Sequence, residues 1–285
     1  MSTKARQLRQ LIAAGCVPMP GAFNALTARL VERVGFPAVY VSGAGLTNAT
    51  VGVPDIGLVG LEEFARLAGY IAAAVKVPVV SDADTGFGGP SNAARTVRAF
   101  EQAGLAGLHL EDQEFPKRCG HLSGKAVVPR NEMVEKIRAA VGARRDPDFL
   151  IIARTDSRAV EGFDAAVDRA NAYLDAGADA IFPEALESPE EFAAFARRVP
   201  APLMANMTEF GKSQLLPLAD LAKMGYRMVI YPQTALRVMM RSAEACLKDL
   251  LSTGTQTGWL DRMQTRQELY ALLDYDPAAD VWPEG

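Results

Sequence analysis

Carboxylate side chains collect at two neighbouring places in the sequence, each at the end of a short apolar run. Asp82 and Asp84 stand two residues apart, Glu111 or Asp112 ends the next run, and Asp55 lies in the preceding polar segment. Carboxylates that crowd together repel one another unless a cation lies among them. Mg²⁺ suits such a set, because it keeps several waters and takes only one or two carboxylates directly. The pattern therefore predicts a magnesium site.

Arg154, at the end of a later apolar run, is the strongest candidate for a ligand-binding cation. An arginine at a strand end is rarely needed for folding, and its guanidinium can bind a carboxylate through two parallel hydrogen bonds. Arg237 and Arg266 lie on segments expected to be helical, where an ordinary surface role is about as good an explanation. Arginines that face a metal indicate a small ligand with several acidic groups.

The segment Lys117–His121, with the sequence KRCGH, carries the remaining chemical signal. Two cations before a cysteine and a histidine just after it lower the pKa of the thiol and prepare it to give or take a proton. We therefore expect Cys119 to take part in chemistry, and Cys16 and Cys246 to be small buried apolar residues. His109, inside an apolar run, is expected to be a packed and hydrogen-bonded histidine.

Short apolar or β-branched runs recur along the chain, separated by segments of helical periodicity. Runs that are apolar almost throughout are typical of parallel strands covered on both faces. Eight such runs alternating with helices predict a closed (β/α)8 barrel of the TIM type, with its working groups at the carboxyl ends of the strands. The predicted strands are Val17–Phe23, Ala38–Ser42, Val77–Ser81, Gly107–Glu111, Phe149–Arg154, Ala180–Glu184, Pro202–Asn206 and Met228–Tyr231.

The ends of the chain are expected to add helices to this α/β barrel. Ser2–Ala14 is predicted to be an N-terminal helix, and a C-terminal helical extension is predicted at about residues 258–273, with its helix at Trp259–Leu273. The extension carries apolar side chains among charges, so a neighbouring subunit is a suitable surface for it to cover. Residues 1–285 are expected to form a single domain.

Composition excludes several classes of partner. The formal net charge of −4 and the pI near 5.4 give no field that would attract nucleic acid or an anionic membrane. No run of about 18 apolar residues is present, and Met1–Gln10 is polar where a signal peptide would be apolar. The three cysteines lie far apart, which excludes a disulfide framework. A cytoplasmic enzyme with a small-molecule substrate is expected.

These motifs resemble those of the isocitrate lyase and phosphoenolpyruvate mutase superfamily, and most of all those of the 2-methylisocitrate lyase branch. The KRCGH segment is the most specific of them. The resemblance covers nearly the whole chain through Ser42–Gly45, Asp82–Gly88, Glu111–Gln113, Lys117–His121, Pro183–Ala185, Asn206–Gly211 and Met263–Tyr270.

The resemblance implies roles for individual residues. Asp82 and Asp84 would hold Mg²⁺, with Asp55 and Glu111 reaching it mostly through water, and Cys119 would be the catalytic thiol. Tyr40 or Glu184 would assist the base, a choice that the resemblance leaves open. The implied substrate-contacting residues are Ser42, Gly43, Ala44, Gly120, His121, Arg154, Glu184, Asn206, Thr208, Arg237 and Arg266.

The resemblance also implies an assembly and a reaction. The last helix would be swapped with a neighbouring subunit in a homotetramer built as a dimer of dimers. The enzyme would cleave 2-methylisocitrate to pyruvate and succinate in the methylcitrate cycle of propionate breakdown. One alternative is a 2,3-dimethylmalate or related substituted-malate lyase. The others, from another reaction class, are a phosphonate mutase and an oxaloacetate-processing enzyme, and enzymes of these two kinds generally lack the cysteine segment.

Some residues depart from the pattern of these lyases. Ala44 stands where they often have glycine, and Leu122-Ser123-Gly124 replaces an Arg-Pro-Asn, which bears on how the loop closes over a substrate. The chain also lacks the large insertions typical of isocitrate lyases. Leu122, Phe182 and Met207 are the candidates for contact with the alkyl group of a substrate, with core packing the more natural role for Phe182.

Overall fold

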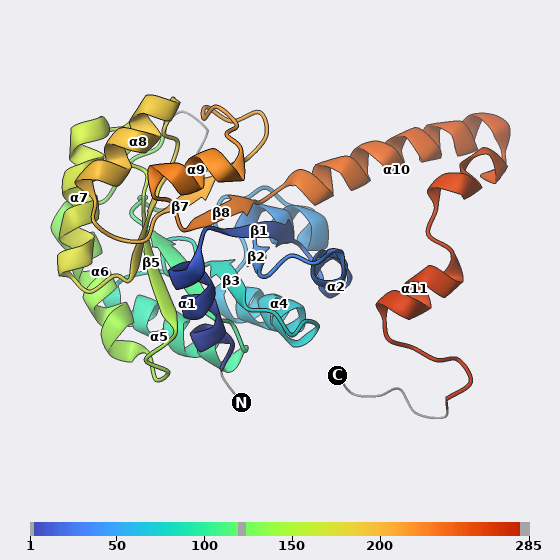
Figure 1. Cartoon of the computed structure of the whole chain (residues 1–285), viewed down its shortest axis with the longest axis horizontal. Coiled ribbons are helices and arrows are strands. Elements are labelled where there is room, and N and C mark those ends of the chain that lie inside the picture. The colour runs from blue at the N-terminus through green and yellow to red at the C-terminus, as the bar shows by residue number, and fades with distance from the viewer. Residues whose placement is uncertain (1–2, 119–123, 280–285) are drawn as a thin grey trace.

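A computed structural model describes residues 3–118 and 124–279 of the chain. Its eight parallel strands follow the order β6-β5-β4-β3-β2-β1-β8-β7, and a bridge between Ile181 and Leu203 joins the two ends of that order. The sheet therefore closes into the predicted (β/α)8 barrel (Figure 1). The strands are β1 Val17–Ala22, β2 Val39–Val41, β3 Val79–Asp82, β4 Gly107–Glu111, β5 Leu150–Thr155, β6 Ala180–Pro183, β7 Met204–Asn206 and β8 Met228–Tyr231.

The observed strands differ from the predicted runs only near their ends. β3 and β7 begin later than predicted, after Pro78 and Pro202. Proline has no N–H to donate to a neighbouring strand, so regular pairing starts beyond it. Nearly every strand residue is buried, as the apolar runs indicate.

Helices follow the strands and cover the outside of the barrel. They are α1 Lys4–Ala14, α2 Ala25–Val34, α3 Gly43–Leu46, α4 Leu61–Ala73, α5 Pro90–Gln102, α6 Arg130–Ala143, α7 Phe163–Asp175, α8 Pro189–Arg198, α9 Leu218–Met224, α10 Thr234–Thr253 and α11 Arg266–Leu272, with a π-helical turn at Thr47–Val51 and 3-10 turns at Ser157–Ala159 and Thr257–Arg262. α2 and α9 end on Gly35 and Gly225, both in the left-handed conformation that glycine adopts without strain.

The amino-terminal end of the barrel is sealed by α1. Leu8 and Ile12 of this helix pack into the same apolar cluster as Met19 and Ile152 in the barrel interior. Lys4 Nζ donates hydrogen bonds to the Ala72 and Val75 carbonyl oxygens, each at 2.6 Å. Because this end is closed and apolar, the polar strand ends at the opposite side are left to form a site.

The C-terminal arm begins with α10, which points away from the barrel in Figure 1 and has no buried residue. The predicted extension at Trp259–Leu273 is broken in two, because Met263 is extended and Thr265 starts α11 in a capping box with Glu268. α11 returns beside α2, and Arg29 forms an ion pair with Asp274 at 3.2 Å.

The exposed face of this arm is apolar over much of its length. The exposed apolar side chains are Val238, Met239, Met240, Leu247, Leu250, Leu251, Leu260 and Met263. Such a surface is typical of one that packs against another protein molecule. No helix in the described ranges has both the length and the apolar character that crossing a membrane requires.

Candidate active site

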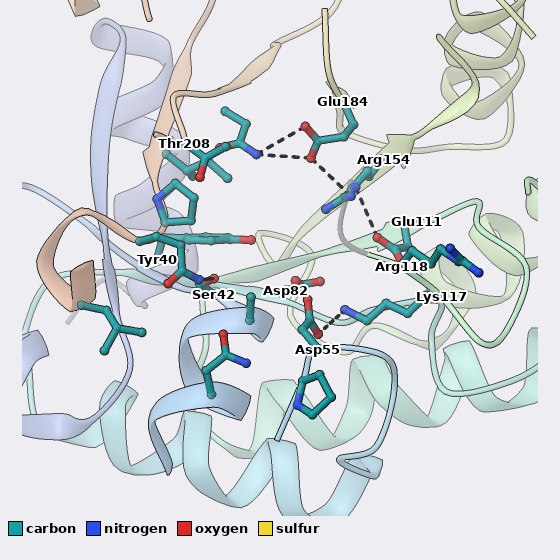
Figure 2. A pocket seen from close by; sticks show the side chains of 18 of the residues that line it. Tyr40, Ser42, Asp55, Asp82, Glu111, Lys117, Arg118, Arg154, Glu184 and Thr208 are labelled. Carbon is teal, nitrogen blue, oxygen red and sulfur yellow. Dashed lines mark hydrogen bonds and ion pairs between the residues drawn. The ribbon is translucent and has the colours of Figure 1, made fainter. Parts of the chain in front are cut away.

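A cavity of about 750 Å³ opens at the carboxyl ends of the strands. Figure 2 shows its side chains converging from several strands, with Asp55, Asp82 and Lys117 in the lower part of the view, Glu184 in the upper part, and Glu111 next to Arg154 between them. Most of the residues that the sequence singled out meet here. Those that line the cavity are Tyr40, Ser42, Ala44, Asp55, Asp82, Glu111, Arg154, Glu184, Asn206, Thr208 and Arg237.

Asp82 and Asp84 are brought together by a tight turn at the end of β3. The Asp84 backbone N–H donates to Asp82 Oδ1 at 3.0 Å, and Asp84 has a φ of 47°. That left-handed conformation is uncommon outside glycine and is found most often where function requires it. The Glu111 N–H donates to the Asp84 carbonyl oxygen at 2.9 Å and ties the end of β4 to this turn.

Lys117 occupies the space between these acids. Its Nζ lies 2.5 Å from Asp84 Oδ1 and 2.6 Å from Asp55 Oδ1, and its side chain is 3% exposed. Burial opposes its charge, but the acids led by Asp84 and Asp82 outweigh burial and hold the Lys117 pKa well above its usual range. The sequence pattern placed Lys117 beside Cys119 and gave no sign of this contact.

Asp55, Asp82, Asp84 and Glu111, which we call the acid group, set four carboxyl groups against the single ammonium of Lys117. Burial, Asp82 and Asp55 raise the pKa of Asp84 to about 7 despite the adjacent ammonium. Burial also raises the pKa of Glu111 well above its usual value. Its Oε1 is buried, and no side chain of the described residues forms a hydrogen bond with it.

These features fit a hard divalent cation. Within the described ranges, no three His, Cys, Asp or Glu side chains already converge on one point as a complete metal site. Mg²⁺ does not need such a cage, because water and substrate oxygens supply most of its ligands. The Lys117 ammonium already stands among the carboxylates as a cation, and a further positive charge beside Asp84 would favour the charged form of this carboxyl, whose pKa burial, Asp82 and Asp55 raise to about 7.

Gly43 lies close against the acid group. A Cβ at this position would stand 2.6 Å from Asp82 Oδ2 and 3.4 Å from Asp84 Oδ1. The Ser42 hydroxyl caps α3 by accepting from the Gly45 N–H at 3.1 Å, and it also accepts from Gln233 Nε2 at 3.2 Å. This short helix therefore brings backbone directly to the carboxylates, which requires glycine.

Arg154 faces the acids from β5 and is held by three carboxylates. Its Nε lies 2.9 Å from Asp156 Oδ2 and 3.3 Å from Glu111 Oε2, and its Nη2 lies 3.3 Å from Glu184 Oε2. The guanidinium also lies over the Phe182 ring, 5.1 Å from its centre. Arg154 is therefore fixed in orientation and points to the cavity, as the sequence predicts for a carboxylate-binding group.

Glu184 and Asn206 form a polar pair beside Arg154. Asn206 Nδ2 donates to Glu184 Oε1 and Oε2 at 3.4 and 3.3 Å, and the Ala185 N–H donates to Oε1 at 2.9 Å. Thr208 follows in the loop after β7 and lines the same wall. A carboxylate held in this way is oriented to accept a proton from a bound hydroxyl group.

Tyr40 and His109 form a buried pair below the acids. Tyr40 Oη lies 2.7 Å from His109 Nε2. Burial, followed by the Asp82 charge, raises the pKa of Tyr40 well above its usual value, and burial lowers the pKa of His109 to about 4. The phenol is therefore the donor and the neutral imidazole the acceptor, and His109 Nδ1 faces Asp82 Oδ1 at 3.6 Å. His109 is the packed histidine that the sequence predicts.

The two later arginines are placed differently. Arg237 lines the cavity from α10, with its Nε 3.5 Å from Glu209 Oε2 and its guanidinium 5.3 Å from the centre of the Phe210 ring. Arg266 is the first residue of α11, on the arm, and is not among the residues that line the cavity of this chain. Cys119, Gly120 and His121 lie outside the described residues.

The three candidates for contact with the alkyl group of a substrate lie in different places. Phe182 lines the cavity although it is fully buried. Met207 is buried, and its Sδ accepts a hydrogen bond from the Leu216 N–H at 3.2 Å, so it does not line the cavity. Leu122 lies outside the described residues. The apolar wall of the cavity also includes Ile230, which the sequence did not single out.

Comparison with known proteins gives a consistent set of relatives. A family model described as phosphoenolpyruvate phosphomutase matches residues 8–251. A probable 2-methylisocitrate lyase of Corynebacterium glutamicum is 56% identical over 258 residues, which cover 90% of this chain and 84% of the relative. A 2-methylisocitrate lyase of Aeropyrum pernix is 52% identical over 94% of this chain and 86% of the relative.

Solved structures share the fold over nearly the whole chain. A 2,3-dimethylmalate lyase has a TM-score of 0.90 and 36% identity, covering 95% of this chain and 92% of that one. A phosphonopyruvate hydrolase in complex with oxalate and Mg²⁺ has a TM-score of 0.86 and 31% identity, with 95% of each chain covered. On the strength of the matched residues and these identities, the chain belongs to the phosphoenolpyruvate phosphomutase family.

Proposed function

We propose that this protein is a Mg²⁺-dependent carbon–carbon lyase that cleaves 2-methylisocitrate to pyruvate and succinate. The observation that carries the proposal is that the acid group, whose charge Lys117 balances only in part, and Arg154 face the same cavity. This arrangement suits a substrate that has both a metal-binding hydroxyl and several carboxylates. The curated relatives at 56% and 52% identity carry the name of this activity.

Mg²⁺ would be held by Asp82 and Asp84, with Asp55 and Glu111 reaching it through water. Bound there, it would polarise the substrate hydroxyl and the adjacent carboxylate, as a Lewis acid does. Lys117 already balances part of the charge on Asp55 and Asp84, so it would have to share these carboxylates with the metal or move away from them.

Arg154 and Arg237 would bind the remaining carboxylates of the substrate from the opposite side of the cavity. Glu184 is the better candidate to take the proton of the substrate hydroxyl. Tyr40 is unsuited to that task, because its raised pKa keeps the phenol protonated and its hydroxyl is committed to His109. Tyr40 would instead position His109 beneath Asp82.

Loss of the hydroxyl proton to Glu184 allows the carbon–carbon bond to break, with the oxygen becoming the keto group of pyruvate. The bonding electrons remain on the succinate carbon, where the neighbouring carboxylate delocalises them. Arg154 stabilises this charge as it develops, which benefits the transition state more than the bound substrate. Cys119 would then donate the proton that completes succinate.

A substituted malate such as 2,3-dimethylmalate is the second candidate substrate, since it offers the same hydroxyl and the two carboxylates on either side of the bond that breaks, but lacks the third carboxylate. The solved 2,3-dimethylmalate lyase shares the fold at 36% identity, compared with 56% for the probable 2-methylisocitrate lyase. A single methyl group, which is the difference between 2-methylisocitrate and isocitrate, contributes about 1–3 kcal/mol to discrimination, so these substrates have to be compared directly.

The deciding experiment offers 2-methylisocitrate, isocitrate and 2,3-dimethylmalate in parallel to the purified protein with Mg²⁺ and measures the release of the 2-oxo acid, which is pyruvate from the first and third substrates and glyoxylate from isocitrate. A strong preference for 2-methylisocitrate supports the proposal and a place in propionate breakdown. Preference for another substrate keeps the lyase reaction and changes the substrate. The absence of release from all three contradicts the proposal and favours a mutase or an oxaloacetate-processing activity.

The assembly that we propose is a cytoplasmic homotetramer in which the C-terminal arm packs on a neighbouring subunit. Support comes from α10, which has no buried residue and exposes a long apolar face. It also comes from Arg266, which stands on the arm away from the cavity of its own chain. Sedimentation of the full chain and of Leu247→Glu/Leu251→Glu tests the assembly, since charges on this face should dissociate it.

A further inference from the structure

Asp156 lies directly behind Arg154 and is fully buried. Its Oδ2 accepts from Arg154 Nε at 2.9 Å, and its Oδ1 accepts from Arg154 Nη2 at 3.2 Å. Two parallel hydrogen bonds of this kind fix a guanidinium in plane and direction. Asp156 accepts the single N–H of Nε and one of the two on Nη2, which leaves the second N–H of Nη2, beside Glu184, and both on Nη1.

Lys125 binds the same carboxylate from the opposite direction. Its Nζ lies 2.6 Å from Asp156 Oδ1, and its side chain is 1% exposed. The loop that carries Lys125 is held nearby, because Gln113 and Val127 form an antiparallel bridge and the Glu114 N–H donates to the Ala126 carbonyl oxygen at 2.9 Å. Burying this ammonium would be costly without the carboxylate, so the pair has to form together.

Asp156 is itself anchored through its backbone. Its N–H donates to Asp112 Oδ1 at 2.8 Å. Asp112 Oδ2 in turn accepts from the hydroxyls of Thr155 and Tyr173, each at 2.7 Å. The network ends on buried side chains that do not line the cavity, so it gives Asp156 a fixed base from which to hold Arg154.

The charges of Asp156, Arg154 and Lys125 indicate a role for Lys125. Asp156 alone would neutralise Arg154 and weaken its attraction for an anionic ligand. With Lys125 on the same carboxylate, Asp156 divides its negative charge between two cations and so neutralises Arg154 less, which matters because Glu111 and Glu184 also lie 3.3 Å from the guanidinium. Attraction between buried charges is strong because little water screens them.

We propose that Asp156 and Lys125 are positioning residues for the lyase, holding Arg154 in orientation and preserving its charge for the substrate carboxylate. This inference rests on the proposed function for the identity of the substrate. Two buried lysines that follow β4 thus contact both halves of the site, Lys117 at the acids and Lys125 at Asp156, the carboxylate that holds Arg154.

The test compares Asp156→Asn, Lys125→Met and the double variant in the full chain. Each single change should lower kcat/KM for pyruvate release by at least about tenfold, with both a higher KM and a lower kcat, because Arg154 binds a substrate carboxylate and stabilises the charge that develops in the transition state. The double variant should lose much less than the product of the two single effects, because both act through Arg154. Lys125→Arg, which keeps the charge, should recover most of the loss.

Tyr173→Phe is the matched control. It removes two hydrogen bonds from the same buried network, the one donated to Asp112 and the one accepted from Arg169, without touching Arg154 or the cavity. It should lower Tm and leave KM and kcat near those of the unchanged protein. If Asp156→Asn and Lys125→Met behave in the same way, with altered Tm and unchanged kinetics, they are purely structural and the inference is wrong.

Binding of oxalate, measured by calorimetry with Mg²⁺ present, separates this inference from the proposed function. If the unchanged protein binds oxalate but releases no pyruvate, the proposed function is wrong. The positioning role is then tested by the oxalate binding constants alone. Affinity weakened at least about tenfold in Asp156→Asn and Lys125→Met, but not in Tyr173→Phe, supports the role. Equal affinities in all variants overturn it, and a protein with neither binding nor release contradicts both ideas.

Discussion

Lys117 Nζ lies 2.6 Å from Asp55 Oδ1 (Figure 2) and 2.5 Å from Asp84 Oδ1, and it bridges two carboxylates that come from different loops. A buried ammonium in this place acts as an internal cation. It lowers the repulsion between the acids when no other cation is present. The stability of the protein without metal should therefore depend on Lys117, and the response to added metal should change when this residue is replaced.

Replacement of Lys117 by methionine should lower the free energy of unfolding in a chelator, by about 3–5 kcal/mol if the acids remain charged. Added Mg²⁺ should then raise Tm more in Lys117→Met than in the unchanged protein, because the metal supplies the missing positive charge and binds only the folded state. Thermal unfolding with and without Mg²⁺ measures both effects.

Lys136→Met is the control for this experiment. Lys136 is also a buried lysine, but its ion-pair partner is Glu132 at 3.8 Å and its Nζ donates to the Thr85 carbonyl oxygen at 3.4 Å, so among the described residues it forms no ion pair with Asp55 or Asp84. Its replacement should leave the Mg²⁺-induced change in Tm unaltered. An equal response to Mg²⁺ in Lys117→Met and in the unchanged protein would show that Lys117 does not occupy the position of a cation.

Gly43→Ala should damage the acid group while leaving the fold intact. The added Cβ would stand 2.6 Å from Asp82 Oδ2, so the carboxylate has to move. Displacement of a catalytic group by about 1 Å can lower the rate roughly a hundredfold. Gly142→Ala, where nothing lies within 4 Å of the new Cβ, should be neutral. Steady-state kinetics and Tm of both variants check the prediction, and similar kinetics in the two would contradict it.

The barrel and most of the site could be predicted because the two depend on simple features of the sequence. Strands covered on both faces have to be apolar throughout, and parallel strands deliver their carboxyl ends to one side. A polar residue that closes such a run, such as Asp82 or Arg154, is therefore both easily recognised and correctly placed. Gly43 followed from the family resemblance, and its close approach to Asp82 gives the physical reason for it.

Contacts set by the path of a long loop could not be predicted in this way. Lys117 and Lys125 stand in a polar segment without periodicity, so nothing in their spacing shows that one meets Asp84 and the other Asp156. The broken C-terminal extension did leave a signal. Thr265 and Glu268 form the T-x-x-E pattern of a capping box, which marks a new helix start inside the region predicted as one helix.

Asp84→Asn should abolish high-affinity metal binding and nearly all activity. Asparagine preserves the shape and tolerates the left-handed backbone at φ 47°, so the change removes charge without adding strain. Calorimetric titration with Mn²⁺, which accepts similar oxygen ligands, measures the metal affinity directly. A variant that stays active in a chelator would show that the acids serve another purpose.

Cys16 should react slowly with alkylating reagents at neutral pH. Burial of this half-buried thiol raises its pKa to about 11. A raised thiol pKa lowers the thiolate fraction at any pH below it, so at pH 8 the fraction is roughly a hundredfold smaller than for a thiol of pKa 9. Iodoacetamide labelling of the Cys119→Ser/Cys246→Ser protein should speed up about tenfold per pH unit from pH 7 to 10. Levelling off near pH 9, as glutathione does, would show that the pKa is not raised.

Cys119→Ser should remove most turnover while leaving substrate binding largely intact. A serine hydroxyl has nearly the same size as the thiol but is a far weaker acid, so it donates a proton to the succinate carbanion much more slowly. The expected pattern is a kcat lowered by a factor of about 10²–10⁴, the usual contribution of general acid catalysis, with little change in the binding constant.

Cys246→Ser, on the outward-pointing α10, should have normal kinetics. Because bond cleavage precedes the proton transfer, a single turnover in Cys119→Ser should still form pyruvate on the enzyme. Near-normal kcat in Cys119→Ser would remove the thiol from the mechanism and leave the proton donor to be sought among the groups that line the cavity.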